Sequence, residues 1–245
     1  MGLEIALIAV SILIALCGLA STVVSIWLFF KYAKYNRYAN SSGLSGEQIA
    51  RKILDDHDLY HIKVSVVGSF MFGNSYSHYF GKVRLRRFTK NKESLTSLGM
   101  GAQKSCLAIL DAEGDPDMAK RIRLVPLITF GPFAFIPLVI IGVLLDLFIF
   151  NGTGLFTFIL GILGFLFYVY SIVLCVMTLK TEKKAQQRAY EILKRDNIIT
   201  EEELLGLQEL FRLYNIQYIN DIILSVLELI YRVLQIAIKL KKLKD

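Results

Sequence analysis

The chain has 245 residues, of which 54% are hydrophobic, and its mean hydropathy is +0.50. This composition excludes an ordinary soluble domain, in which polar residues are spread along the whole chain. The net charge of +7 does not indicate nucleic acid as a partner, because the basic residues lie beside long apolar stretches, where they have a topological explanation.

The charged residues are confined to separate parts of the chain. None of the 28 Lys and Arg residues lies in residues 1–30 or 124–179. Membrane-spanning segments exclude charge, because a charge at the centre of a bilayer is costly. The pattern therefore predicts an integral membrane protein. Residues 31–123 contain 16 basic and 9 acidic residues, which suits a domain held against anionic headgroups, so membrane lipids are expected partners.

The first predicted element is a transmembrane anchor in residues 1–30. Residues 5–30 carry no charge and exceed the roughly 20 residues needed to cross a bilayer. No basic segment precedes this stretch and no small-residue cleavage site follows it. We therefore interpret it as a retained anchor and not as a signal peptide.

Residues 31–123 are predicted to form a small cytosolic α+β domain. Ser45 and Gln48 form a capping box that opens a helix reaching about residue 56. Residues 62–67 and 83–88 alternate as short strands, with a hairpin loop at 73–79 between them. A longer helix with one buried stripe is expected over 92–113. The stripe comprises Leu95, Leu98, Ala102, Cys106 and Ile109.

A transmembrane hairpin is predicted for residues 124–179. Its two spans cover 124–150, with a single charge at Asp146, and 155–179, and the turn 151–154 joins them. Basic residues follow the first span, precede the second and follow the third, whereas the first four residues and the turn contain none. The positive-inside rule therefore places the N-terminus outside and residues 31–123 in the cytosol.

Residues 180–245 are predicted to be helical. Residues 180–214 complete the cytosolic domain, with one helix over 182–195 and another capped at Thr200. Residues 215–245 form an amphipathic helix, which either lies in the membrane interface or spans the bilayer with its polar stripe turned inward. The stripe comprises Gln217, Asp221, Ser225, Glu228, Arg232, Gln235 and Lys239. The predicted fold class is a mainly α-helical membrane protein with three transmembrane helices, this C-terminal helix and a small α+β domain.

Several short stretches resemble, in the same order, the YugP-like neutral zinc metallopeptidases of bacterial membranes. They are residues 40–46 (NSSGLSG), 50–54 (ARKIL), 82–85 (KVRL), 94–99 (SLTSLG) and 124–126 (LVP). The resemblance covers about residues 30–215. It implies a metallopeptidase-like domain and a location as a multi-pass protein of the bacterial cell membrane.

In that family, the stretch corresponding to 94–99 leads into a His-Glu-x-x-His helix, whose histidines bind zinc and whose glutamate is the general base. In this chain the same register reads Gln103-Lys104-Ser105-Cys106-Leu107. The resemblance thus places Gln103 and Leu107 at the imidazole positions and Lys104 at the position of the base. Glu182 takes the place of the family's third, acidic ligand. We therefore expect no catalytic residue, no bound zinc and no other cofactor.

Other candidates for chemistry are weak. His57 and His61 are four residues apart near acidic residues, but they lie where a helix is ending, which favours a polar turn over a metal site. His78 lies in the predicted loop and is interpreted as structural. Cys106 has no neighbouring base in the sequence that could activate a thiol nucleophile.

The missing zinc predicts a new ion pair. Without a metal, a buried Glu182 has no counter-charge, and an isolated buried carboxylate is costly. Lys104 has the charge and the reach to supply one. We therefore predict that Lys104 and Glu182 pair; the alternative is two unrelated surface charges.

The resulting hypothesis is a catalytically inactive membrane metallopeptidase homologue, a pseudoprotease that acts as a protein-binding scaffold or regulatory subunit. Its expected partner is another membrane or membrane-associated protein, and homo-oligomerisation is left open. One alternative is an active membrane zinc metallopeptidase with a divergent site. A second alternative is a structural subunit of a larger membrane complex.

Overall fold

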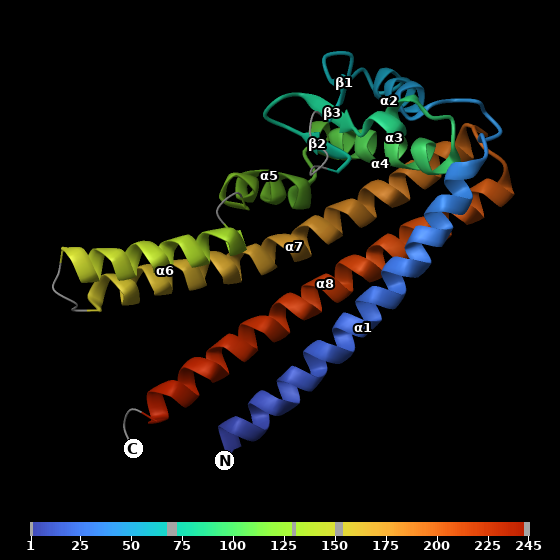
Figure 1. The fold of residues 1–245 in the computed structure, drawn as a ribbon. Helices are drawn as coiled ribbons and strands as arrows, with labels where there is room; N and C mark the ends of the chain where they lie inside the picture. The colour runs from blue at the N-terminus through green and yellow to red at the C-terminus, as the bar shows by residue number, and fades with distance from the viewer. Residues whose placement is uncertain (1, 68–72, 129–130, 150–153, 243–245) are drawn as a thin grey trace. The chain divides into compact units, whose positions relative to one another are not determined.

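The computed structural model of the chain describes residues 2–67, 73–128, 131–149 and 154–242. They belong to two compact units. The hairpin unit comprises residues 1–17, 120–178 and 222–245, and the domain unit comprises residues 18–119 and 179–221. Three long helices have parts in both units, namely α1 (Gly2–Arg37), α7 (Leu155–Arg195) and α8 (Glu201–Lys242) (Figure 1).

In the domain unit, α2 (Gly46–Asp55) begins as its sequence predicts. The Ser45 side chain accepts a hydrogen bond from the backbone N–H of Gln48, and the Gln48 side chain accepts one from the Ser45 N–H. This capping box satisfies two backbone donors that a helix start leaves unpaired. The predicted capping box is confirmed.

The sheet of the domain unit differs from the predicted hairpin. Its strands β1 (Lys63–Val66), β2 (Ser75–Ser77) and β3 (Lys82–Leu85) lie in the order β1-β3-β2, and β1 runs parallel to β3. The expected loop 73–79 contains β2, which pairs antiparallel with β3. The tight turn of the hairpin lies at 78–81, where Gly81 adopts a positive φ of 54°. The prediction of a hairpin between the first and last strands was therefore wrong.

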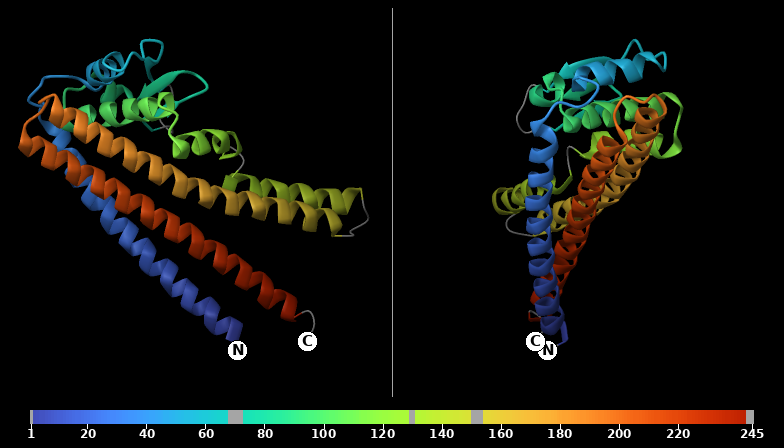
Figure 2. Two further views of the ribbon diagram at one scale, coloured as in Figure 1. Left: turned by 180° about the vertical axis from the view of Figure 1, so that it is seen from behind. Right: turned by 90° about the vertical axis from the view of Figure 1, so that its right-hand side faces the viewer.

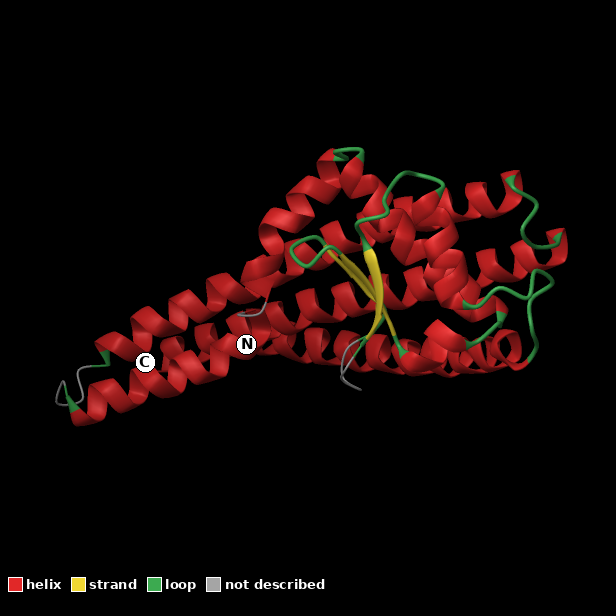
Figure 3. Ribbon diagram, turned by 90° about the horizontal axis from the view of Figure 1, so that it is seen from above, coloured by secondary structure: helices red, strands yellow, loops and turns green. Residues whose placement is uncertain are grey.

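The end of β3 was also placed too late. The strand stops at Leu85, whereas it was predicted to continue through residues 86–88. A short helix, α3 (Arg87–Asn91), begins there instead. Val83 and Leu85 are fully buried, as the alternation predicts. Figure 3 shows that these three strands are the only sheet in the part of the chain that the structure describes.

Helix α4 (Leu95–Ala112) is the centre of the domain unit. Ser94 caps its start by accepting a hydrogen bond from the Ser97 N–H, and Gly114 follows its end with a positive φ of 71°. All residues from 95 to 110 are buried, so the expected single stripe was too narrow. The reason is that α2, α3, β2 and β3 all pack on α4. In addition, Glu182 of α7 and Leu207 of α8 contact it.

Two glycines allow close packing around α4. A Cβ on Gly101 would lie 2.3 Å from the carbonyl oxygen of Gly46, so the backbones of α4 and α2 are in contact there. A Cβ on Gly99 would lie 2.2 Å from the Leu207 side chain of α8. Such contacts explain how one helix is covered on all its faces.

Helices α1 and α7 are long and apolar enough to cross a membrane. No residue of α1 is buried within the structure, which suits contact with lipid or with another protein. Helix α7 joins the predicted third span and the predicted helix 182–195 into 41 continuous residues. Helix α8 likewise joins the helix capped at Thr200 with the predicted C-terminal helix 215–245, so no break separates them.

The predicted second span, 124–150, falls in two described helices, and residues 129–130 between them lie outside the described residues. It begins inside α5 (Pro116–Ile128) and continues in α6 (Gly131–Phe148), whose apolar portion is the shorter stretch Pro137–Phe148. The predicted turn at 151–154 lies outside the described residues except for Gly154.

Helix α6 and the first turns of α7 lie side by side in the hairpin unit (Figure 1, Figure 2). The buried carboxylate of Asp146 accepts hydrogen bonds from the backbone N–H groups of Phe156 (3.1 Å) and Thr157 (2.8 Å). These donors belong to the first turn of α7, where a helix leaves N–H groups unpaired. A Cβ on Gly142 would lie 2.7 Å from the Thr157 Cα, so the two helices approach closely.

Polar side chains of the C-terminal stripe contact other helices. In the domain unit, Gln217 donates a hydrogen bond of 2.9 Å to Ser21 of α1. In the hairpin unit, Tyr168 of α7 donates to Glu228 at 3.3 Å, and Arg232 lies over its ring. Within each unit, these residues of the stripe therefore face a neighbouring helix, and the choice between an interfacial and a spanning helix stays a prediction.

Candidate functional site

The residues that the sequence resemblance aligns with the family's His-Glu-x-x-His motif lie inside the domain unit. Gln103 is 4% exposed, Lys104 is 8% exposed and Leu107 is 1% exposed. Gln103 and Leu107 are four residues apart on α4 and therefore share one face of the helix. Their burial follows from the packing of α4 and is independent of any ligand.

Glu182, on α7, is brought to these residues from 78 positions away in the sequence. Its Oε2 atom accepts a hydrogen bond of 2.7 Å from Gln103 Nε2 and one of 2.7 Å from Lys104 Nζ. Glu182 is itself only 4% exposed. The structure thus brings together Gln103, Lys104 and Glu182, and we call these three residues the amide–ammonium–carboxylate cluster.

The cluster contains a buried ion pair. The side chains of Lys104 and Glu182 are 10% and 5% exposed, so both charged groups have lost most of their water. A buried ion pair is tolerated when the two charged groups are close together and make further hydrogen bonds. The Gln103 amide donates one such hydrogen bond to Glu182. The alternative of two unrelated surface charges does not describe this arrangement.

The three residues that follow Lys104 on α4 do not join the cluster. The Ser105 hydroxyl donates a hydrogen bond of 3.2 Å to the Ala50 carbonyl of α2. Cys106 is fully buried, and burial raises the pKa of its thiol to about 12, which leaves almost no thiolate at neutral pH. Leu107 contributes only an alkyl side chain.

A zinc ion does not fit this donor set. Zinc sites in proteins use thiolate, imidazole and carboxylate ligands, and a catalytic site usually has three of them. Of the three residues of the cluster, only Glu182 has a side chain of this kind. The Gln103 amide directs its N–H towards the Glu182 carboxylate, and the Lys104 ammonium would repel a dication. Within the described ranges, no group of three or more His, Cys, Asp and Glu residues is arranged to hold a metal.

The three histidines do not form a common site with one another. His57 lies just beyond α2, with its Nδ1 atom 2.8 Å from the Ile53 carbonyl, and His61 is exposed. His78 Nδ1 lies 2.6 Å from Asp111 Oδ2, and the Tyr76 hydroxyl donates to the same oxygen at 2.6 Å. Burial, followed by the hydrogen bond to Asp111, raises the pKa of Tyr76. Sequence reasoning missed this last cluster because it assigned β2 to a loop.

A group of ion pairs at the surface joins α7 to the end of α4 and the start of α5. Lys180 contacts Asp117 at 2.9 Å, and Lys184 contacts both Asp115 and Asp117 at 2.6 Å. Arg188 contacts Glu113 at 2.9 Å. Hydrogen bonds from Lys184 and Lys180 lower the pKa of Asp117 to about 2. These pairs lie on the same stretch of α7 as Glu182 and help to position it.

Comparison with known proteins gives the family. A model of the family described as "Putative neutral zinc metallopeptidase" matches residues 9–237. The chain belongs to this family. The match includes α4 and the part of α7 that carries Glu182, and it extends beyond the expected range of 30–215 at both ends.

The chain is also similar to a curated protein. It is 24% identical over 223 residues to the "Putative membrane protease YugP" of Bacillus subtilis (strain 168), and the match covers 86% of this chain and 91% of that protein. No solved structure matches the chain. The name of the relative and the two apolar helices agree in indicating membrane association.

Proposed function

We propose that this family member is a catalytically inactive membrane pseudoprotease, which acts as a protein-binding scaffold or regulatory subunit. The observation that supports this proposal is the cluster of Gln103, Lys104 and Glu182. The Lys104 ammonium occupies the charge-balancing role beside Glu182 that a zinc ion would have in a peptidase of this family.

The chemistry of the cluster does not support peptide hydrolysis by the family's route. A general base must accept a proton from water, and the Lys104 ammonium is a hydrogen-bond donor held on a carboxylate. Gln103 and Leu107 offer no imidazole. The Cys106 thiol, with its raised pKa, does not replace the missing nucleophile.

Zinc content tests the inactive site directly. The purified protein is expected to carry zinc far below one ion per chain, and its unfolding temperature should not change when a chelator is added, because no metal contributes to its folding. Elemental analysis and a thermal melt with and without chelator provide the two readings. A tightly held zinc ion at a stoichiometric amount, with cleavage of an unfolded protein, would instead establish an active peptidase with a divergent site.

The scaffold role is tested by recovery of a partner. Affinity purification of the full chain in mild detergent, followed by mass spectrometry, should return a defined membrane or membrane-associated protein. The exposed apolar residues of α1, including Phe29 and Phe30, are available for such contacts within the bilayer. Recovery of several subunits in fixed ratio would support the structural-subunit alternative, and recovery of this chain alone would support a homo-oligomer.

The proposed topology has three spans, an external N-terminus and a cytosolic domain unit. Cysteine variants of Gly152, in the turn outside the described residues, and of Lys90, in α3, test it in intact cells. A reagent that does not cross membranes should modify the cysteine at 152 and leave the one at 90 unmodified, because basic residues remain in the cytosol. The opposite labelling pattern would reverse the orientation, and labelling at both sites in disrupted cells is the control.

A further inference from the structure

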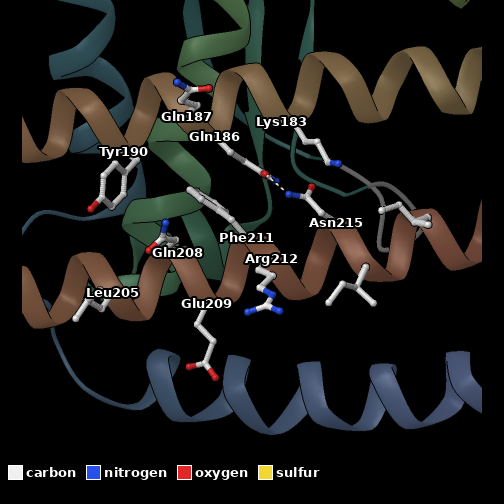
Figure 4. Close-up of a pocket in the computed structure, with 12 residues that line it drawn as sticks. Lys183, Gln186, Gln187, Tyr190, Leu205, Gln208, Glu209, Phe211, Arg212 and Asn215 are labelled. Carbon is white, nitrogen blue, oxygen red and sulfur yellow. Dashed lines mark hydrogen bonds between the residues drawn. The ribbon is translucent and has the colours of Figure 1, made fainter.

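A pocket opens between α7 and α8 within the domain unit, and neither Lys104 nor Glu182 lines it. Its volume is ≈ 750 Å³, and Figure 4 shows the side chains of both helices that surround it. On the α7 side it is lined by Lys183, Gln186 and Tyr190 among others, and on the α8 side by Arg212 and Asn215. Asn215 Nδ2 donates a hydrogen bond of 2.7 Å to Gln186 Oε1 across the pocket.

The pocket has an excess of positive charge. Its acidic residue, Glu209, is already neutralised, because its carboxylate contacts Lys31 at 2.7 Å and accepts a hydrogen bond from Tyr35 at 2.8 Å. Lys183 and Arg212 form no ion pair with any residue that the structure describes.

Lys183 differs from the other basic residues on this part of α7. Lys180, Lys184 and Arg188 all pair with acidic residues at the α4–α5 junction. Lys183 lines the pocket instead. Two unpaired cations in one pocket favour an anionic ligand.

The pocket begins where the apolar part of α7 ends. Leu179 is the last residue of the uncharged stretch, and Lys183 follows it by four residues, or about 6 Å along the helix axis. The Gln186–Asn215 hydrogen bond fixes the register of the antiparallel helices, so Lys183 lies level with the apolar Ile216 and Ile219 of α8, which also line the pocket. Cations beside apolar side chains at this depth match the headgroup region of a bilayer.

We propose that this pocket is a binding site for an anionic phospholipid. Lys183 and Arg212 interact with the phosphodiester group, the Gln186–Asn215 pair contacts the polar headgroup, and Ile216 and Ile219 contact the start of the acyl chains. A zwitterionic lipid is expected to bind more weakly, because the positive group of its own headgroup is repelled by Lys183 and Arg212. This site is independent of the proposed loss of catalysis, because it uses none of the residues of the amide–ammonium–carboxylate cluster.

Native mass spectrometry of the full chain in mild detergent tests the proposal. Phosphatidylglycerol and phosphatidylcholine with identical acyl chains are titrated separately, and the bound lipid is counted. The variant Lys183→Gln/Arg212→Gln should bind phosphatidylglycerol roughly thirtyfold more weakly, because each basic residue near an anionic headgroup contributes about fivefold. The charge-retaining variant Lys183→Arg/Arg212→Lys should bind like the unchanged protein.

A matched control removes the same charge elsewhere. Arg87 and Lys194 are exposed residues of the domain unit that do not line the pocket. The variant Arg87→Gln/Lys194→Gln should keep its affinity for phosphatidylglycerol within about twofold, because distant exposed charges are screened. Circular dichroism shows that each variant is folded before its lipid binding is compared.

Four results would overturn the proposal. They are equal binding of phosphatidylcholine, equal losses in the pocket variant and the control variant, displacement of phosphatidylglycerol by excess inorganic phosphate, and its displacement by an acidic peptide. The third result would assign the pocket to a soluble phosphate compound, and the fourth to a protein partner. Selective binding of phosphatidylglycerol that only the pocket variant loses supports the lipid site.

Discussion

Replacement of Lys104 by methionine is expected to lower the free energy of unfolding of the detergent-solubilised protein by about 3–5 kcal/mol, because it leaves a buried carboxylate without its counter-charge. Methionine keeps most of the volume of the lysine side chain, so the loss reports mainly on the charge. Glu182 would keep the hydrogen bond from Gln103 and lose the ion pair with Lys104. Denaturant-induced unfolding, followed by circular dichroism, gives the measurement.

A double-mutant cycle shows whether the effect belongs to the pair. Glu182→Gln in the Lys104→Met background should recover part of the lost stability, since it removes the isolated charge. Lys184→Met is the matched control, because Lys184 also forms short ion pairs but is 36% exposed, and such pairs contribute about 1 kcal/mol or less. If the effects of Lys104→Met and Glu182→Gln simply add, the two groups are not coupled and the pair does not replace the metal.

If the chain is a pseudoprotease as proposed, introducing the family's motif residues at three positions should create a zinc site. The variant Gln103→His/Lys104→Glu/Leu107→His places two imidazoles one turn apart on α4, beside Glu182 as the third ligand. It is expected to bind zinc stoichiometrically and to gain about 4 kcal/mol of stability at a free zinc concentration a thousandfold above Kd. Elemental analysis and the shift of the unfolding transition with zinc measure both effects.

The control for this variant is Gln103→His/Lys104→Glu, which keeps Leu107 and therefore lacks the second imidazole. It should fold and bind zinc much more weakly than the triple variant. A triple variant that folds but binds no more zinc than this control would show that α4 and Glu182 do not keep the spacing of a metal site. The pseudoprotease proposal would then lose the link to the family's metal geometry.

Local signals in the sequence were sufficient to predict parts of the domain unit. The capping box of Ser45 and Gln48 acts within one turn, and Gly114 ends α4 through its own φ, so neither depends on distant contacts. The approach of Lys104 to Glu182 was expected from charge balance, once the family resemblance had aligned both residues with positions of the family's zinc site. That inference needed the resemblance, because nothing local links residues so far apart in the sequence.

Other features depend on distant contacts and could not be predicted in this way. Strand β2 is three residues long and includes two serines, and only its pairing with β3 makes it a strand. Without β2, the cluster of Tyr76, His78 and Asp111 had no reason to form. The full burial of α4 was missed for a related reason, since helical periodicity describes one covered face and not a helix that is covered on every face.

If α6 and α7 cross the bilayer as proposed, the Asp146 carboxylate affects how they insert into it. The first-turn N–H groups of α7 would be costly in hydrocarbon if they were left without acceptors, and a lone carboxylate would be costlier still. The hydrogen bonds between Asp146 and these N–H groups can form only when α6 and α7 are already paired. The two helices are therefore expected to leave the translocation machinery as one preassembled unit, and not as independent segments that meet later in the membrane.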